Sequence, residues 1–333
     1  MNPLFHKSTT STDIKTRINT QISAQQHIVD QLAIPDKALM DPNEVAPIYK
    51  HVNSNHGDIW YEDESHVYFR VGPNGYREPL ISATTLIGAF ETPFNEQLQA
   101  ERCAAKHDYH AKCLDKTDWP QLTKAARKSR ILAAWKQNRD ESAYYGTTVH
   151  AALEYLVKNR TFDADAAYNF INRKYNYKNP VIKSFSNDFA SRFYSNITTA
   201  SHQVVAEPLL YDMDLKVAGQ SDLVVIDWAN RLIHVADYKT NVKKPGSKED
   251  AAYNNFQGVL NHLPQTKLIH YGLQIALYQT MLIKMFAAYG QIMAPGLNYI
   301  LWANRETGYI EPIGVQYSDY ANDVQRIYDY ILN

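Results

Sequence analysis

The chain has 333 residues, of which 45% are hydrophobic, so it can bury one large core or two smaller ones. Its formal net charge of −1 excludes a uniformly basic protein, so any surface for nucleic acid must be local. A signal peptide and an apolar run long enough to span a membrane are both missing, and there are only two cysteines. These features predict an intracellular, cytoplasmic protein without a disulfide framework.

The N-terminal region, residues 1–80, is predicted to contain a helix and a short hairpin. The helix is expected over residues 16–32 and ends before Pro35. The hairpin is expected over residues 59–71, where apolar and polar residues alternate around a turn.

Residues 80–87 predict a short strand or ordered loop that leads into a helix. The hydroxyls of Ser82, Thr84 and Thr85 suit contacts to phosphates and make these residues candidate nucleic-acid ligands. The alternative is that they belong to an ordinary Ser/Thr strand whose hydroxyls have partners inside the protein.

Residues 101–139 form the most basic stretch, with ten Lys or Arg against four Asp or Glu. The spacing is helical, and Pro120 predicts a break between two helices. We expect the basic helical region 81–145 to roof the active site and grip a phosphate backbone, with Arg127, Lys128 and Arg130 as candidate ligands. The alternative is a solvated charged helix.

A further helix is predicted to begin at Gly146. Apolar residues recur at helical spacing between Val149 and Val157, and His150 lies beside this stripe with Glu154 one turn later. A histidine in this position can be a hydrogen-bonded core residue or a metal ligand. Another helix is expected over residues 181–197.

Three β-branched runs predict a meander of antiparallel strands over residues 203–211, 216–226 and 231–237. Glu207 lies in the first run, directly before Pro208, which suits an edge strand or a strand end. An edge glutamate of this kind can be either a solvated side chain or a ligand.

Charged residues gather on the two later strands. Side chains two apart on a strand share a face, so Asp237 and Lys239 are expected to point the same way, with Tyr238 opposite. Asp222 on the neighbouring strand can join them. Two carboxylates and an ammonium on apolar strands are costly unless they are compensated, and a hard divalent ion such as Mg²⁺ is the natural partner.

The remainder of the chain predicts a loop, a helix, two strands and a final helix. Lys243 and Lys244 lie in the loop. They can either contact phosphates of a nucleic acid or face the solvent and keep the loop hydrated. Gln274 and Tyr278 share one face of an amphipathic helix over residues 267–289. The strands are expected over residues 297–302 and 309–316, and the last helix over residues 318–332.

Four motifs resemble those of the PD-(D/E)XK nuclease superfamily, and in particular its RecB-like branch. They are G-T-x-x-H at residues 146–150, G-x-x-D at 219–222, D-x-K at 237–239 and Q-x-x-x-Y at 274–278. Residues 82–86 are similar to a segment that precedes the core in phage-type exonucleases and in the mitochondrial genome maintenance exonuclease. The proline of the superfamily's name is absent before Asp222, as is common in the RecB-like branch.

The resemblance implies a fold and a division of the chain. The expected fold is α/β: a restriction-endonuclease-like mixed β-sheet flanked by helices, with a mostly helical N-terminal region over the active site. The nuclease core is expected over residues 146–333. No G-x-x-x-x-G-K-(S/T) motif occurs, so no ATP-driven motor is expected in this chain.

The resemblance also implies roles for the candidate residues. His150, Asp222, Asp237 and the backbone carbonyl of Tyr238 would hold Mg²⁺ or Mn²⁺, and Glu207 would recruit a second ion. Lys239 would orient or help deprotonate the attacking water, and Gln274 and Tyr278 would line the mouth of the site. The complete set of residues expected in the chemistry is therefore His150, Glu207, Asp222, Asp237, Tyr238, Lys239, Gln274 and Tyr278.

The expected function is a metal-dependent DNA exonuclease that prefers single strands or free ends, in the host cytoplasm if the chain is phage-encoded. Some RecB-like nucleases hold an iron–sulfur cluster through four cysteines, three of them after the core. This chain has only Cys103 and Cys113, so no such cluster is expected. The alternatives are an endonuclease or an RNA-directed nuclease with the same site, and a non-catalytic nucleic-acid-binding protein on a nuclease fold.

Overall fold

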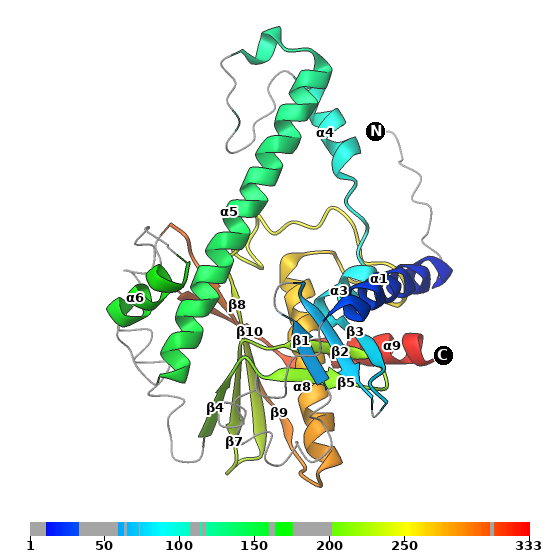
Figure 1. Ribbon diagram of the computed structural model, residues 1–333, viewed down its shortest axis with the longest axis vertical. Coiled ribbons are helices and arrows are strands. Elements are labelled where there is room, and N and C mark those ends of the chain that lie inside the picture. Colours follow the sequence, from blue (N-terminus) through cyan, green and yellow to red (C-terminus); the bar gives the residue numbers. More distant parts are fainter. Residues whose placement is uncertain are drawn as a thin grey trace.

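The computed structural model describes residues 11–32, 59–62, 65–72, 74–106, 114, 118–159, 164–175, 202–306 and 310–333. These residues form two mixed β-sheets flanked by helices (Figure 1). The expected α/β fold of restriction-endonuclease-like organisation is therefore confirmed. The helix expected over residues 181–197 lies outside the described residues.

The first sheet has five strands in the order β1-β2-β3-β6-β5. The parallel pair is β3 with β6, and the other neighbours are antiparallel. The predicted N-terminal hairpin is confirmed as β1 and β2. The strands are β1 (Ile59–Glu62), β2 (Val67–Val71), β3 (Arg77–Ser82), β5 (Leu209–Asp212) and β6 (Val217–Gln220).

The second sheet carries the strands with the charged motifs, in the order β10-β9-β8-β7-β4. The parallel pair is β8 with β9, and the other neighbours are antiparallel. The strands are β4 (His202–Ala206), β7 (Leu223–Asp227), β8 (Leu232–Lys239), β9 (Ala294–Ala303) and β10 (Ile310–Val315).

Two of the three strands predicted for the meander are each divided in two. The run 203–211 forms β4 and then β5, and the run 216–226 forms β6 and then β7. The first break falls at Glu207, whose φ of 52° lies in the left-handed region, and Pro208 follows it. The second falls at Ser221 and Asp222. At both breaks the chain passes from one sheet to the other, so the acidic residues at the breaks lie where the sheets meet.

Helices cover both faces of the second sheet. On one face, Val149 and Leu153 of α5 share a core cluster with Leu223 and Leu301 of the sheet. On the other face, the buried side of α8 packs against β8 and β9 and also reaches β5 of the first sheet. The helices are α1 (Ser11–Gln31), α3 (Ala83–Ala89), α4 (Glu96–Ala104), α5 (Lys124–Lys158), α6 (Ala164–Tyr175), α8 (Lys267–Ala288) and α9 (Tyr317–Leu332). Two 3₁₀ turns, η2 (Trp119–Gln121) and η4 (Gly258–Leu260), are also formed.

The prediction that a helix begins at Gly146 is wrong. Helix α5 has 35 residues and begins after Thr123, whose hydroxyl accepts a hydrogen bond of 3.2 Å from the backbone N–H of Ala126. The helix therefore continues without interruption from the basic helical region into the expected nuclease core, across the boundary expected between residues 145 and 146. A Cβ atom at Gly146 would lie 3.3 Å from the hydroxyl oxygen of Thr240, so the glycine permits a close approach between α5 and the end of β8.

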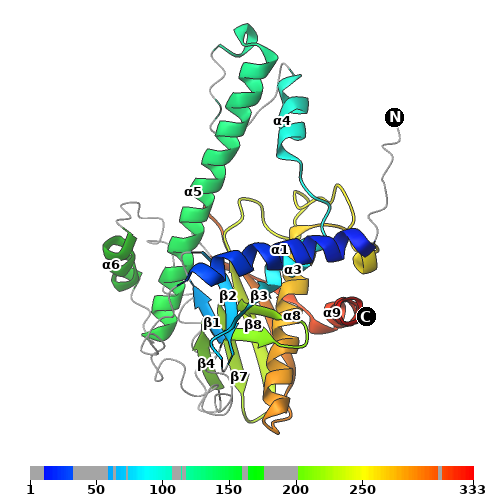
Figure 2. The same ribbon diagram turned by 45° about the vertical axis from the view of Figure 1, so that its right-hand side comes forward.

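The basic region forms a projecting arm. We use this name for α4, η2 and residues 124–144 of α5, which extend away from the two sheets and do not lie across them as a roof (Figures 1 and 2). The expected break at Pro120 is confirmed, because this residue lies in η2 between α4 and α5. Trp119 and Ile131 are fully buried between the helices, so the arm has a small core of its own.

Within the described residues, no helix combines the length and the apolarity that crossing a bilayer requires.

Candidate metal centre

Asp222 is the residue around which the candidate site is built. It lies directly before β7 and is 7% exposed. Its Oδ1 atom is 3.0 Å from Nδ1 of His150 on α5, and its Oδ2 atom accepts a hydrogen bond from the backbone N–H of Tyr238 on β8. Its backbone carbonyl accepts a hydrogen bond of 3.1 Å from the N–H of Glu207. One aspartate thus joins α5, β8 and the break between β4 and β5.

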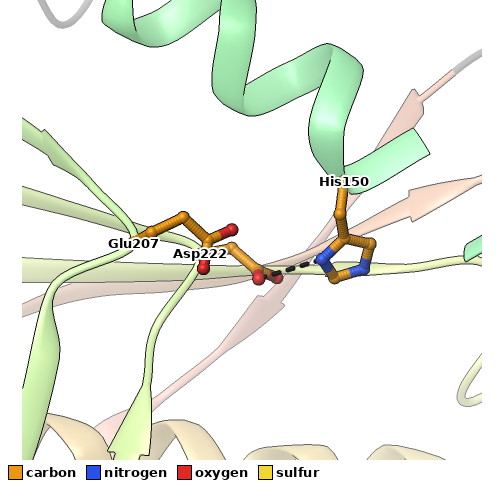
Figure 3. A group of neighbouring side chains, drawn as sticks. All are labelled: His150, Glu207 and Asp222. Carbon is orange, nitrogen blue, oxygen red and sulfur yellow. Dashed lines mark hydrogen bonds and ion pairs between the residues drawn. The ribbon is translucent and has the colours of Figure 1, made fainter. Parts of the chain in front are cut away.

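A possible cation site is formed by Asp222 with His150 and Glu207. One ligand atom from each of the three side chains lies within 4.8 Å of the others. Figure 3 shows Glu207 and His150 approaching Asp222 from opposite sides. An imidazole with carboxylates is a donor set that Mn²⁺ accepts, and Mg²⁺ prefers the carboxylate oxygens. The residues therefore fit the divalent ion that the sequence predicts.

Asp237 and Lys239 form an ion pair on the same face of β8, as the alternation of the strand predicts. Both side chains are largely buried, and the ammonium lies 4.6 Å from the ring centroid of Tyr271 on α8. Tyr238 is buried on the opposite face against α5, where its ring meets the ring of His150 edge-on at 5.6 Å between centroids. Asp237 is paired with Lys239 in this arrangement and is not part of the group formed by His150, Glu207 and Asp222.

Burial and mutual repulsion raise the pKa values of two of the carboxyl groups. Burial raises the pKa of Glu207 to about 9, with further contributions from the charges of Asp222, Glu154 and Asp237. Burial also raises the pKa of Asp237 to about 6, because the neighbouring Lys239 offsets only part of the penalty. At neutral pH the carboxyl group of Glu207 therefore holds a proton that a bound cation would displace, whereas Asp237 is protonated only below about pH 6.

Neighbouring charges favour the ionised forms of the remaining groups of the site. Burial works to raise the pKa of Asp222, but the charge and the hydrogen bond of His150 outweigh it and lower that pKa. The pKa of His150 is raised because the charge of Asp222 overcomes the opposing effect of burial. The pKa of Lys239 is likewise raised, since Asp237 and Asp222 more than offset its burial.

Glu154 is a contributor to the site to which the sequence analysis assigned no role. It lies one helical turn after His150 on α5, its charge helps to raise the pKa of Glu207, and its carboxylate is 2.7 Å from the ammonium of Lys158. The i,i+4 spacing from His150 was the available signal, because residues four apart share one face of a helix.

Gln274 and Tyr278 are buried next to the site and do not line its mouth in this structure. They are 5% and 3% exposed, and Nε2 of Gln274 donates a hydrogen bond of 3.0 Å to the hydroxyl of Tyr278. The ring of Tyr278 packs on Gly219, where a Cβ atom would lie only 2.6 Å from the ring. The glycine of G-x-x-D and the tyrosine of Q-x-x-x-Y are therefore in direct contact.

The three hydroxyl residues predicted to bind phosphate differ in their surroundings. The hydroxyl of Ser82 caps α3 by accepting a hydrogen bond of 3.0 Å from the N–H of Thr85, and it donates one of 2.7 Å to the hydroxyl of Thr85. Thr84 is exposed. The alternative of internally partnered hydroxyls therefore describes Ser82 and Thr85 in this structure.

The basic residues predicted to contact nucleic acid are spread over the arm and a loop. Arg127 is 7% exposed and donates hydrogen bonds to the carbonyls of Trp119 and Pro120 at 3.0 and 3.3 Å, so its guanidinium supports the arm internally. The remaining four pair with acidic side chains or a carbonyl: Arg130 with Asp118, Lys128 with Glu101, Lys244 with Glu311, and Lys243 with the carbonyl of Glu249. None of the five is among the residues that surround Asp222.

An α/β fold with acidic residues, an imidazole and a buried lysine at the meeting point of two sheets is an arrangement that suits metal-dependent phosphodiester hydrolysis. The sequence profile of the PD-(D/E)XK nuclease superfamily matches residues 101–326, and the chain belongs to this superfamily. The matched residues run from the arm to α9 and include every member of the candidate centre. No curated protein matches the chain.

Proposed function

We propose that the protein is a metal-dependent deoxyribonuclease of the RecB-like branch and that it acts as an exonuclease on single strands or free ends. The observation that carries the proposal is the convergence of His150, Glu207 and Asp222 beside the ion pair of Asp237 and Lys239. These residues come from α5 and from two breaks between sheets, so their meeting is a property of the fold.

His150, Asp222, Asp237 and the carbonyl of Tyr238 would hold Mg²⁺ or Mn²⁺, with Glu207 available for a second ion. When bound, the ion supplies Lewis-acid neutralisation of the phosphate charge and activation of a water molecule. His150 and Glu207 position Asp222 through the hydrogen bonds described above.

The residue that acts directly on the substrate is Lys239. Its pKa is raised, so its ammonium is charged at neutral pH, and Asp237 and the ring of Tyr271 fix its position. A fixed positive charge next to the scissile phosphate orients the attacking water and stabilises the additional charge of the transition state. This role does not require the lysine to lose its proton.

The decisive experiment is digestion of end-labelled single- and double-stranded DNA in Mg²⁺ and in Mn²⁺, with EDTA as the metal-free control. We expect metal-dependent release of nucleotides from free ends, and loss of activity in Asp237→Asn and Lys239→Ala. Lys174→Ala, on the exposed part of α6, is the matched control and should retain activity. Unchanged cleavage in either site variant would contradict the assigned roles.

Three further substrates separate the alternatives. Cleavage of circular single-stranded DNA would identify an endonuclease, and preferential cleavage of linear RNA would identify an RNA-directed enzyme. Binding of DNA without cleavage in either metal would identify a non-catalytic protein. The presence of Asp222, Asp237 and Lys239 together favours catalysis over the last alternative.

A further inference from the structure

Two neighbouring cavities share part of their lining, and the first of them adjoins the end of β8. The first has a volume of about 340 Å³ and is lined by Asn241, Val242 and Lys243, which follow directly on the end of β8. The second has a volume of about 610 Å³ and lies between α1, α3 and the start of α8. Both are lined by Glu91, Gln265 and Lys267, so they adjoin each other, and we refer to the two together as the groove.

Side-chain contacts link the groove to the candidate centre. The ammonium of Lys239 lies over the ring of Tyr271, whose hydroxyl donates a hydrogen bond of 2.8 Å to Oδ1 of Asn241. Asn241 lines the first cavity. A nucleic-acid strand that leaves the scissile position on this side would therefore reach the groove at Asn241, close to Lys239.

Most acidic groups of the groove already have partners within the protein. Glu91 pairs with His270 at 2.7 Å, and the carboxylate of Asp250 accepts hydrogen bonds from the backbone N–H groups of Gly246, Lys267 and Leu268. The side chain of Lys267, in contrast, has no hydrogen-bond or salt-bridge partner among the described residues. Its charge helps to lower the pKa of the Glu91 carboxyl, and its ammonium can still donate hydrogen bonds to a ligand of opposite charge.

The far end of the groove carries an exposed aromatic ring. Phe94 lines the second cavity and is 70% exposed, and its ring lies 5.9 Å from the ring of Trp135 at the base of the arm. Thr85, one of the predicted phosphate ligands, lines the same cavity. An exposed aromatic next to hydroxyls and a cation is the combination that binds unpaired bases and their phosphates.

We propose that this groove holds the unpaired strand on one side of the scissile phosphate, with Phe94 stacking on a base and Lys267 contacting a backbone phosphate. Cavities of about 340 and 610 Å³ have the size of binding sites for small ligands such as single nucleotides. The inference rests on the proposed function and specifies its substrate as single-stranded nucleic acid.

The test measures binding and chemistry separately. Binding of a fluorescent 12-nucleotide oligothymidylate is followed by anisotropy in the Asp237→Asn background, where cleavage does not deplete the ligand. Phe94→Ala should weaken binding about ten-fold and Phe94→Tyr should restore it. Lys267→Gln should lower the slope of log affinity against log salt by about 0.7, the value for one phosphate contact of a single strand. Ile292→Ala, 77% exposed outside the groove, is the matched control.

Hydrolysis of bis-p-nitrophenyl phosphate, which is too small to reach the groove, reports on the metal centre alone. The rate should be equal in the wild-type protein and in the control Ile292→Ala, and it should be lost in Lys239→Ala. Unchanged oligonucleotide binding in both Phe94→Ala and Lys267→Gln would contradict the proposal that the groove binds the strand. Duplex DNA that competes with the oligothymidylate as well as single-stranded DNA does would contradict it too. A wild-type protein that hydrolyses neither the small diester nor DNA would contradict the proposed function, while the anisotropy measurements would still decide the groove.

Discussion

The acidic residues around Asp222 determine how the candidate centre responds to pH. A divalent ion binds ionised carboxylates, so protons compete with it below the pKa values of about 6 for Asp237 and about 9 for Glu207. We therefore predict that Mn²⁺ affinity rises between pH 6 and pH 9 and that binding releases protons. Calorimetry in buffers of different ionisation enthalpy measures the number of protons released.

Glu207→Gln is the informative variant for this prediction. The glutamine amide does not titrate in this pH range, so the rise in Mn²⁺ affinity above pH 7 should become shallower than in the wild type. An affinity that is constant between pH 6 and pH 9 in the wild-type protein would contradict the assignment of these carboxyl groups as ligands.

The contact between Gly219 and Tyr278 makes a second prediction at the scale of single residues. Gly219→Ala places a methyl group 2.6 Å from the tyrosine ring, and overpacking of this kind costs about 1–3 kcal/mol of unfolding free energy. In a Tyr278→Ala background the ring is gone, so the same glycine substitution should cost clearly less. Urea unfolding of the four proteins of this cycle gives the coupling, and equal costs in both backgrounds would refute it.

At the scale of the elements, Arg127 is predicted to support the arm and not to bind nucleic acid. Arg127→Ala removes two hydrogen bonds of a charged group and the contact of the guanidinium with the ring of Trp119, and should lower stability by about 2 kcal/mol. Arg102→Ala, on the exposed side of α4, should change stability by less than about 0.5 kcal/mol. Denaturant unfolding compares the two variants, and an equal effect would show that Arg127 has no special structural role.

The elements also show what the sequence could and could not predict. Long amphipathic helices such as α8 and the alternation of Asp237 and Lys239 were predicted correctly, because periodicity reports which face is buried. The break at Ser221 was missed because apolar residues continue on both sides of it, and at Glu207 the following proline left both an edge strand and a strand end open. In addition, the left-handed conformation at the first break is adopted by a glutamate and not by a glycine.

At Gly146 the sequence analysis predicted a helix start that the structure does not contain. A glycine inside a helix costs about 1 kcal/mol relative to alanine, so the sequence there indicates a helix start. In the structure the helix continues and Thr240 occupies the space beside the glycine. For the candidate centre, the motifs indicated His150 and Asp222, and the family resemblance added Glu207. The contact between Gly219 and Tyr278 depends on tertiary packing that no local pattern contains.

At the scale of the whole molecule, a bound ion should stabilise the junction between the two sheets. Glu207 and Asp222 lie at the two breaks, and His150 adds α5, so an ion held by all three would join separate parts of the chain. At a free ion concentration 100 times the Kd, the gain in unfolding free energy is about 2.7 kcal/mol. We expect Mn²⁺ to raise the thermal midpoint of the wild-type protein but not that of Asp222→Asn; equal increases would place the ion elsewhere.

The unbroken course of α5 has a mechanical consequence. Thirty-five residues of continuous helix form a stiff rod of roughly 50 Å that carries the outer arm at one end and His150 near the other. Gly146 lets this rod pass close to Thr240 at the end of β8. We expect that a bulky group attached to the tip changes the rate of cleavage through the rod, and that glycine substitutions at Gln137 and Asn138, which soften the helix, reduce this change.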